Sequence, residues 1–379
     1  MTQTYFLGDD ERLFKDSLTK LLADWSDAER RKAAASEPGY SKAVWKKLAD
    51  AGALGAFLPE AAGGIGGNGL SLMVAMEAFG KACFPSPYPW TVAAAAPLLS
   101  SGGDAGNALL GQIASGDAVA TVAFHEPKSR YDLNHVETRA EKKGSGYVLT
   151  GKKTAVPYGG GADCVLVPAR VSGDTRDQNG IALFMVDPKA KGVKVASYAT
   201  VDSARAADIE LSGVEVAGVL GTPGKAHADL QRAADMASLA LCAEAVGHMR
   251  ALLDMTVAYT KTRQQFGVAL STFQALQHRM VDMFAATETA ASHVQAALAH
   301  IASPSSPVDG RTALLTRIAI DKSARLVGQD AVQIHGGMGM TDDLIVGHHF
   351  KRLTLLQLTL ADAGKLMERY RILEEGVAA

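Results

Sequence analysis

The 379-residue sequence has few cysteines and no metal-binding spacing. It holds three cysteines, far apart among apolar or small residues: Cys83, Cys164 and Cys242. An odd number argues against a disulfide framework, and no CxxC or HExxH motif is present. The ten histidines are scattered, apart from the pair His348–His349. We therefore expect buried, reduced thiols in a cytoplasmic protein, and no bound metal.

The sequence also lacks an excess of charge of either sign. Lysine and arginine number 38 against 40 aspartates and glutamates, which gives a formal net charge of −2. No basic stripe stands out, so we expect no nucleic-acid partner. No run approaches the roughly 18 apolar residues of a membrane span. The start, MTQTYFLGDDERLF, has no basic segment before an apolar run, which argues against a secretory signal.

The common nucleotide-binding and hydrolase motifs are missing as well. The chain has no P-loop, no GxGxxG after a strand and no GxSxG. These absences argue against P-loop, Rossmann and α/β-hydrolase sites. The length and the 47% of hydrophobic residues predict two or three domains.

The texture of the sequence changes twice along the chain. Residues 1–117 are rich in Ala and Leu with helical spacing, interrupted by a glycine-dense stretch at 61–70. Between 118 and 225, short β-branched runs alternate with turn residues, which predicts an antiparallel β domain. From 226 to 379 long amphipathic patterns return, broken at 302–310, which predicts a four-helix bundle. The predicted fold class is α+β, in the order helical domain, β domain, bundle.

Two motifs stand out in the last third of the chain. TRQQFG occupies residues 262–267, and QIHGGMGM occupies residues 333–340. Taken alone, the first motif is typical of a helix C-terminus, where Arg263 complements the helix dipole and Gly267 caps the last turn. We favour that interpretation for the first motif in isolation. The second motif has three glycines where a plain turn between helices needs one.

Taken together, the two motifs offer the parts of a nucleotide site. Arg263 can bind a phosphate through its fork of donors. Phe266 and Phe273 can cover a flat ring. Gly336 and Gly337 expose backbone amides that a nucleotide can approach closely. The pair therefore predicts a site for an adenine dinucleotide between helices.

This pairing of R-x-x-F-G and F-Q with Q-I-H-G-G-x-G resembles the acyl-CoA dehydrogenase family. The resemblance covers nearly the whole chain. Residues 48–82 look like the N-terminal helical domain of that family, and ATVAFHEP at 120–127 looks like the start of its middle β domain. ALCAEAVGHMRALLDMTVAYTKTRQQFG at 240–267 looks like the start of its C-terminal bundle. The family order of domains matches the order predicted above from pattern alone.

The resemblance implies an FAD-dependent oxidoreductase that desaturates an acyl-CoA between Cα and Cβ. In the family a carboxylate removes the α-proton and the β-hydride passes to flavin N5. The flavin ring lies between the β domain and the bundle of one chain, and the adenine half reaches into a neighbouring chain. The elements that receive it map to these positions: Arg263, Gln265, Phe266, Gln274, Gln333, Ile334, Gly336 and Gly337.

The same resemblance implies partners and a cellular role. We expect a homo- or heterotetramer built as a dimer of dimers, because an FAD that bridges two chains requires an oligomer. Electron-transfer flavoprotein or a similar acceptor is the implied electron partner. Fatty-acid or steroid side-chain degradation is the implied process.

The residues around the flavin ring depart from the family pattern. The family stretch T-E-P-G-A-G-S-D corresponds to HEPKSRYD at 125–132, which places Lys128 and Arg130 at small-residue positions. The next element, usually Trp-Ile-Thr, is Ala155-Val156-Pro157. Proline has no N–H to donate, and alanine cannot cover a ring.

The catalytic base departs further. The usual glutamate position falls on Leu360, and the alternative position on the first bundle helix falls on Ala237, followed by Ser238 in place of an arginine. Neither side chain can take a proton. Asp362 is the nearest substitute and our candidate base, although we favour a structural role for it. Glu244 is expected to be a packing or interface residue.

Some members of the family are heteromers in which one chain brings the flavin-ring pocket and the base, and the other keeps the fold and the adenine cleft. HHFKRLTLLQLTLADA at 348–363 makes this chain resemble the small subunit of pimeloyl-CoA dehydrogenase-type enzymes. Two alternatives stay open. One is a flavin monooxygenase on the same fold, against which the adenine cleft argues. The other is a non-catalytic structural subunit.

Overall fold

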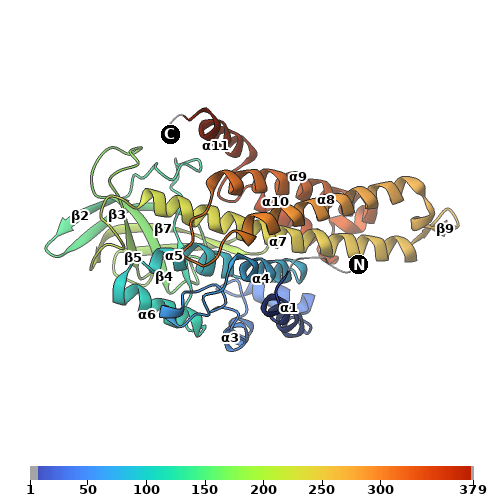
Figure 1. The fold of residues 1–379 in the computed structure, drawn as a ribbon, viewed down its shortest axis with the longest axis horizontal. Coiled ribbons are helices and arrows are strands. Elements are labelled where there is room, and N and C mark those ends of the chain that lie inside the picture. The colour runs from blue at the N-terminus through green and yellow to red at the C-terminus, as the bar shows by residue number, and fades with distance from the viewer. Residues whose placement is uncertain (1–6, 377–379) are drawn as a thin grey trace.

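The computed structural model describes residues 7–376. The first six residues, part of the segment in which we expect no secretory signal, lie outside the described range. The chain forms an elongated molecule with a β domain at one end and a long helical bundle reaching to the other (Figure 1). Near the middle, α4 (Gly69–Lys81) of the N-terminal helices lies beside α7 (His227–Thr262) of the bundle.

The N-terminal part is helical, as predicted. Its elements are α1 (Asp9–Leu21), α2 (Asp27–Ala35), α3 (Lys42–Asp50), α4 (Gly69–Lys81), the π-helical η2 (Pro89–Ala95), α5 (Ala96–Leu99) and α6 (Gly103–Ala114). Local capping fixes several starts. Ser26 and Glu29 form a reciprocal capping box at α2, and Asn68 accepts hydrogen bonds from two backbone amides at the start of α4.

The middle part is one seven-stranded sheet with the order β1-β4-β2-β3-β7-β6, in which β5 pairs with β4. The strands are β1 (Ala120–Val122), β2 (Arg139–Lys143), β3 (Gly146–Pro157), β4 (Cys164–Arg170), β5 (Ile181–Val186), β6 (Val193–Ala199) and β7 (Arg205–Val216). The sheet is mixed, because β1 runs parallel to β4 and β2 meets β4 in one parallel pair. The prediction of a purely antiparallel domain was therefore wrong in this detail.

The C-terminal part is built on α7 (His227–Thr262). A small hairpin of β8 (Gln264–Gln265) and β9 (Val268–Ala269) and the 3-10 turn η3 (Leu270–Thr272) follow. The remaining elements are α8 (Gln274–Ala299), α9 (Gly310–His335), the 3-10 turn η4 (Gly336–Met340), α10 (Ile345–Leu356) and α11 (Ala363–Glu375). Helices α7, α8, α9 and α10 pack on one another.

Helix α7 has the length and composition of a membrane span, which the sequence analysis missed. Within the fold, 89% of its apolar window is buried by protein, and its side chains belong to the same hydrophobic core cluster as those of α4 and the sheet. It is the central core helix of the described chain.

The expected domain boundaries after residues 117 and 225 stay predictions. They fall in two connections, one between α6 and β1 and the other between β7 and α7.

Candidate functional site

The first motif forms the turn at the far end of the bundle. Arg263 ends α7 as its C-cap, and the hairpin then turns through Phe266 and Gly267, which have φ values of 54° and 81°. The Phe266 side chain is 93% exposed and meets the ring of Phe273 edge to face, with centroids 6.2 Å apart. Within residues 7–376, the Arg263 guanidinium has no hydrogen-bond or ion-pair partner. An unpaired cation thus lies at the base of the hairpin whose turn carries the exposed ring of Phe266.

The second motif ends α9 at the same end of the bundle. Gln333, Gly336 and Gly337 are exposed, whereas Ile334 is buried in the core. Gly336 has a φ of 63°, and a Cβ built on Gly336 or Gly337 would meet no atom within 4 Å. The backbone of these two glycines is therefore open to a ligand.

The imidazole of His335, within the second motif, has a structural role that the sequence did not reveal. The Nδ1 atom of His335 lies 2.8 Å from the Ala331 carbonyl oxygen, and its ring stacks on Tyr259 with centroids 4.4 Å apart. Tyr259 precedes Arg263 by about one helical turn. The stacked pair thus brings the two motifs together.

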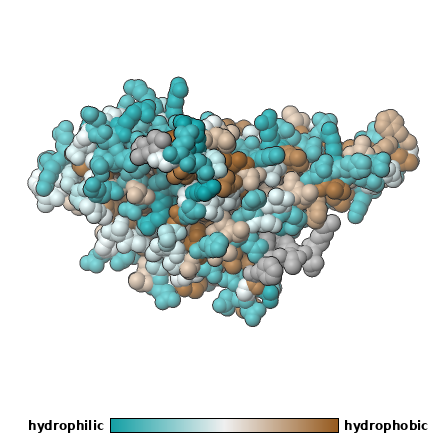
Figure 2. Space-filling model, turned by 45° about the horizontal axis from the view of Figure 1, so that its top comes forward, coloured by the Kyte–Doolittle hydropathy of each residue, from teal (hydrophilic) through white to brown (hydrophobic). Residues whose placement is uncertain are grey.

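This end of the bundle fits the adenylate and pyrophosphate of a dinucleotide. Arg263 offers a free fork of donors, Phe266 an exposed ring, and the glycines an approachable backbone. Two further predicted residues, Gln265 and Gln274, are exposed on the hairpin and at the start of α8. The Gln265 amide donates to the Gln264 carbonyl oxygen. All these groups face outward, so they form one open surface of this chain. Figure 2 shows hydrophobic side chains at this end of the molecule.

A cavity of about 250 Å³ lies between the β domain and the bundle. Its lining includes Trp90, Phe124, Tyr131, Tyr158, Tyr198 and Leu360. Arg205 and Arg352 add two cations, whereas no aspartate or glutamate lines this cavity among the described residues. The Arg352 guanidinium is already held by Glu244 and Asp202.

The cavity wall is strained at four positions. Tyr131, Ala155, Tyr158 and Leu360 all line it, and their φ values are 73°, 50°, 52° and 65°. Left-handed backbone at a residue other than glycine costs roughly 1–2 kcal/mol. Such strain gathers at functional sites, where the surrounding structure holds it in place. The wall is therefore a shaped surface rather than an incidental gap.

Glu126, in the segment of residues 125–127, is buried behind this cavity wall. The Glu126 carboxylate is buried and accepts hydrogen bonds from Lys153 Nζ at 2.7 Å and from Thr138 Oγ1 at 2.6 Å. On the cavity side, both ring nitrogens of His125 are buried without a hydrogen-bond partner among the described residues. Burial, assisted by the Lys153 charge, lowers the pKa of His125 to about 4. His125 is therefore neutral and offers a free donor and acceptor.

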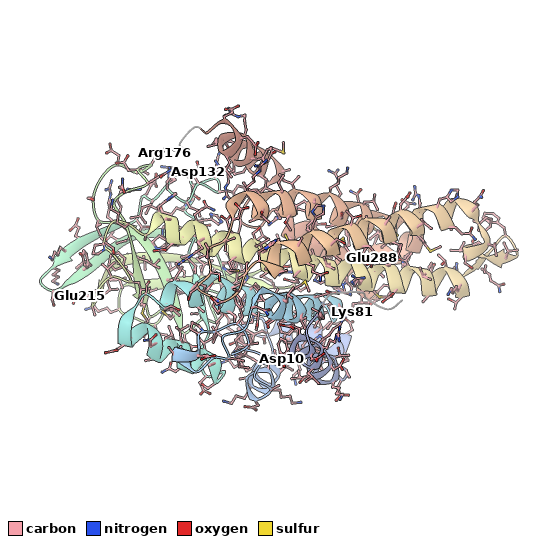
Figure 3. The ribbon with its side chains drawn as sticks, in the orientation of Figure 1. Asp10, Lys81, Asp132, Arg176, Glu215 and Glu288 are labelled. Carbon is pink, nitrogen blue, oxygen red and sulfur yellow. The ribbon has the colours of Figure 1, made fainter. Side chains whose placement is uncertain are left out.

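Two ion pairs of Asp132 hold the loop that carries Tyr131. Asp132 and Arg176 lie together near α11 (Figure 3), and their oxygen and nitrogen are 3.0 Å apart. Asp132 also contacts the Lys365 ammonium on α11. The loop is thus clamped between the β domain and the last helix.

The predicted base positions carry no free carboxylate. Leu360 lines the cavity, and Ala237 is buried in α7. The Asp362 carboxylate accepts a hydrogen bond from the Lys365 backbone N–H at 2.8 Å and caps α11. Asp362 is not among the residues that line the cavity. Its geometry is that of a helix N-cap, and its role as a base stays a prediction.

The cavity between the β domain and the bundle, where the family resemblance would place the flavin ring, therefore fits a flavin poorly. Pro157 lines the cavity where an amide donor would be needed, and Ala155 offers no ring to cover a flavin.

Comparison with known proteins gives matches along nearly the whole chain. The chain matches the N-terminal, middle and C-terminal domains of acyl-CoA dehydrogenases over residues 8–117, 121–214 and 228–359. It is 31% identical to the probable acyl-CoA dehydrogenase YngJ of Bacillus subtilis over 325 residues, which cover 83% of this chain and 85% of that protein.

Two solved structures are similar over almost their whole length. A variant of the Tcur3481–Tcur3483 steroid ACAD has a TM-score of 0.87 at 29% identity, with 98% of this chain and 99% of that chain covered. The ChsE4–ChsE5 complex from Mycobacterium tuberculosis has a TM-score of 0.86 at 26% identity, with 99% and 100% covered.

Proposed function

Because the chain belongs to the acyl-CoA dehydrogenase family, we propose that it is one chain of a heteromeric FAD-dependent acyl-CoA dehydrogenase. The family consists of FAD-dependent oxidoreductases that act on the CH–CH bond of acyl-CoA. In this proposal the chain supplies the adenine cleft, and a homologous partner chain supplies the flavin-ring pocket and the base.

The observation that carries the proposal is the missing base. Proton abstraction next to a thioester needs a base within hydrogen-bond reach, and a general base is typically worth about 10²–10⁴-fold. Leu360 occupies the wall at that position, and Asp362 is engaged as a helix cap. Among the described residues, the cavity keeps a shaped aromatic wall without a carboxylate, and the low pKa of His125, about 4, makes that imidazole a weak base for the α-proton.

The hairpin end of the bundle would hold the cofactor of the partner. Arg263 would bind the pyrophosphate, Phe266 would cover the adenine, and the backbone amides of Gly336 and Gly337 would approach the adenylate. Bound FAD supplies the two-electron acceptor for the desaturation. The unpaired guanidinium of Arg263 and the open glycine backbone support these roles.

Two similar structures support an assembly of two different chains. One similar structure is described as a complex of ChsE4 with ChsE5, and the other is named for two components, Tcur3481 and Tcur3483. We propose a tetramer of two such unlike pairs, located in the cytoplasm, that delivers electrons to electron-transfer flavoprotein or a similar acceptor. The acyl group of the substrate stays open between fatty acids and steroid side chains.

Co-expression tests the proposal. The chain is purified alone and with a homologous chain that carries a glutamate at the base position, and both preparations are assayed with acyl-CoA and an artificial electron acceptor. We expect little or no turnover by the chain alone, turnover by the complex, and fewer than one FAD per polypeptide. Turnover by the chain alone would contradict the proposal.

Asp362→Asn separates the two roles of Asp362 within the same experiment. Asparagine is also a good N-cap, so a structural Asp362 should tolerate the change with activity of the complex preserved. The matched control is Asp309→Asn, because Asp309 caps α9 in the same manner and is not among the residues that line the cavity. Selective loss of activity in Asp362→Asn, with the complex intact, would make Asp362 the base.

A further inference from the structure

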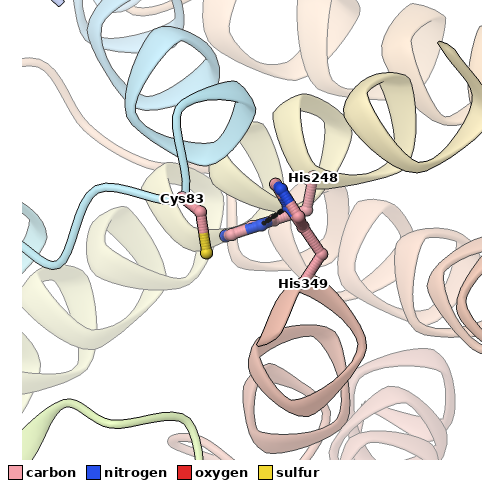
Figure 4. Close-up of side chains that lie close together, drawn as sticks. All are labelled: Cys83, His248 and His349. Atoms are coloured by element: carbon pink, nitrogen blue, oxygen red, sulfur yellow. Dashed lines mark hydrogen bonds between the residues drawn. The ribbon is translucent and has the colours of Figure 1, made fainter. Parts of the chain in front are cut away.

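Three buried side chains with metal-binding atoms meet outside the lining of the large cavity. Cys83 follows α4, His248 lies in α7 and His349 lies in α10 (Figure 4). One ligand atom from each side chain lies within 4.8 Å of the other two. The exposed fractions are 9%, 2% and 1%, and none of the three lines the large cavity.

Close helix packing brings the three residues together. Helices α4 and α7 cross through glycines on both sides: a Cβ on Gly80 would lie 2.0 Å from the Glu244 carbonyl oxygen, and one on Gly247 would lie 2.1 Å from the Glu77 carbonyl oxygen. The chain then turns so that Cys83 adopts a φ of 48°. This left-handed conformation is unfavourable for cysteine, and backbone strain of this kind gathers at functional sites.

The two imidazoles are oriented by hydrogen bonds. A neutral imidazole carries one nitrogen lone pair. His248 Nε2 lies 3.4 Å from Glu244 Oε1, and its Nδ1 lies 2.7 Å from His349 Nδ1. When Nε2–H donates to Glu244, the lone pair of His248 is on Nδ1, which faces His349. A carboxylate that orients a metal-binding histidine in this manner is common in metal sites.

A small cavity of about 20 Å³ adjoins the cluster and is lined by Cys83, His248, Glu244 and Arg30 among others. This volume is close to what one water molecule needs. Arg30 is 3% exposed, and its Nη2 atom has no hydrogen-bond partner within the described part of the chain. A buried unsatisfied donor indicates an acceptor that the protein itself does not provide. The cavity therefore has both the room and the donor for one bound water.

The charged groups around the cluster balance one another. The anions are Asp27, Glu244 and Asp202, and the cations that pair with them are Arg30, Arg31 and Arg352. The group therefore carries no net charge. A thiolate at Cys83 would add one negative charge, which a bound metal ion would neutralise.

We propose that Cys83, His248 and His349 bind a divalent metal ion, zinc by preference, with a water molecule in the small cavity as the fourth ligand. One thiolate, two imidazoles and a water suit zinc in a four-coordinate site. On binding, the sulfur–metal bond replaces the S–H bond and the proton leaves to solvent, while the His349 proton moves from Nδ1 to Nε2. The site would join α4, α7 and α10 into one unit. It departs from our expectation of no bound metal.

Cobalt(II) titration of the full-length chain tests the site. The protein is treated with chelator and then titrated with Co²⁺, whose sulfur-to-metal charge-transfer absorption reports a thiolate ligand. We expect this absorption to saturate at one equivalent per chain and to disappear on addition of excess Zn²⁺. It should be lost in Cys83→Ser and retained in the matched control Cys242→Ser, which changes another buried cysteine.

A double variant keeps the test decisive if Cys83→Ser does not fold. Cys164→Ser/Cys242→Ser leaves Cys83 as the chain's single cysteine. Any thiolate absorption in that variant must come from Cys83, and a raised unfolding midpoint with Zn²⁺ should accompany it. No charge-transfer absorption in the folded wild type, or its survival in folded Cys83→Ser, would overturn the proposal.

Discussion

Glu244→Gln removes the buried carboxylate that holds Arg352. In the wild type the carboxylate accepts hydrogen bonds from Arg352 Nε at 2.7 Å and Nη2 at 2.9 Å. Burial acts to raise the pKa of Glu244, but the Arg352 charge and the hydrogen bonds from His248 and Arg352 outweigh it and lower the pKa to about 2. The usual value is 4.5. The shift corresponds to about 3 kcal/mol of folding free energy at roughly 1.4 kcal/mol per pKa unit.

The direction of this shift fixes the pH dependence. Because the folded pKa lies below the unfolded one, the stabilisation by Glu244 is complete above pH 4.5 and is lost as the pH falls towards 2. Glutamine does not titrate, so the Glu244→Gln variant lacks this pH-dependent stabilisation. The free energy of unfolding of the variant should therefore be about 3 kcal/mol lower than that of the wild type at pH 7. This difference should become smaller in acid.

Urea unfolding between pH 7 and pH 3 measures this difference, with chelator present so that no metal contributes. Glu215→Gln is the matched control, because Glu215 pairs with Lys143 at 2.6 Å with both side chains exposed. Exposed pairs contribute little, so the control should stay close to wild type at every pH. A deficit in Glu244→Gln that stays constant down to pH 3 would refute the ion-pair reasoning and leave lost packing as the cause.

Three further outcomes test the hairpin end and the α11 cap. Arg263→Ala should weaken FAD retention by the complex by about 1.5–3 kcal/mol, as expected for a charge-assisted bond, and Arg263→Lys should rescue it poorly; unchanged FAD content after dialysis would contradict this role. Gly336→Ala should lower stability by about 1–2 kcal/mol because of its positive φ, whereas Gly337→Ala should leave the unfolding midpoint unchanged and still reduce FAD retention. Asp362→Ala should cost about 0.5–2 kcal/mol by loss of the cap, measured by thermal unfolding; no loss would remove the structural role.

The sequence predicted features that depend on local pattern. The alternation of helical and strand periodicity gave the α–β–α order, and the arginine and glycine of TRQQFG marked the end of a long helix, where the structure has the C-cap Arg263. Asp362 was expected to be structural, and its cap follows from its position just before a helical pattern.

Features that depend on distant contacts could not be predicted. The parallel pairing of β1 with β4 joins segments that no hairpin connects. The stacking of Tyr259 on His335 depends on how α7 and α9 align. The approach of Cys83 to His248 and His349 depends on the crossing of α4 and α7. The spacing of residues within one segment does not predict contacts between segments that are distant in the sequence.

Helix α7 has 36 residues, which correspond to a rod of about 54 Å at 1.5 Å per residue. It begins beside the β domain and ends at the hairpin, so its length sets the span between the cavity and the cofactor end. One inserted residue in its middle would turn everything beyond it by about 100°. Glu244 and Tyr259 could then no longer both face their partners. We expect homologues to keep the residue count of α7, while insertions and deletions accumulate in the surface loops.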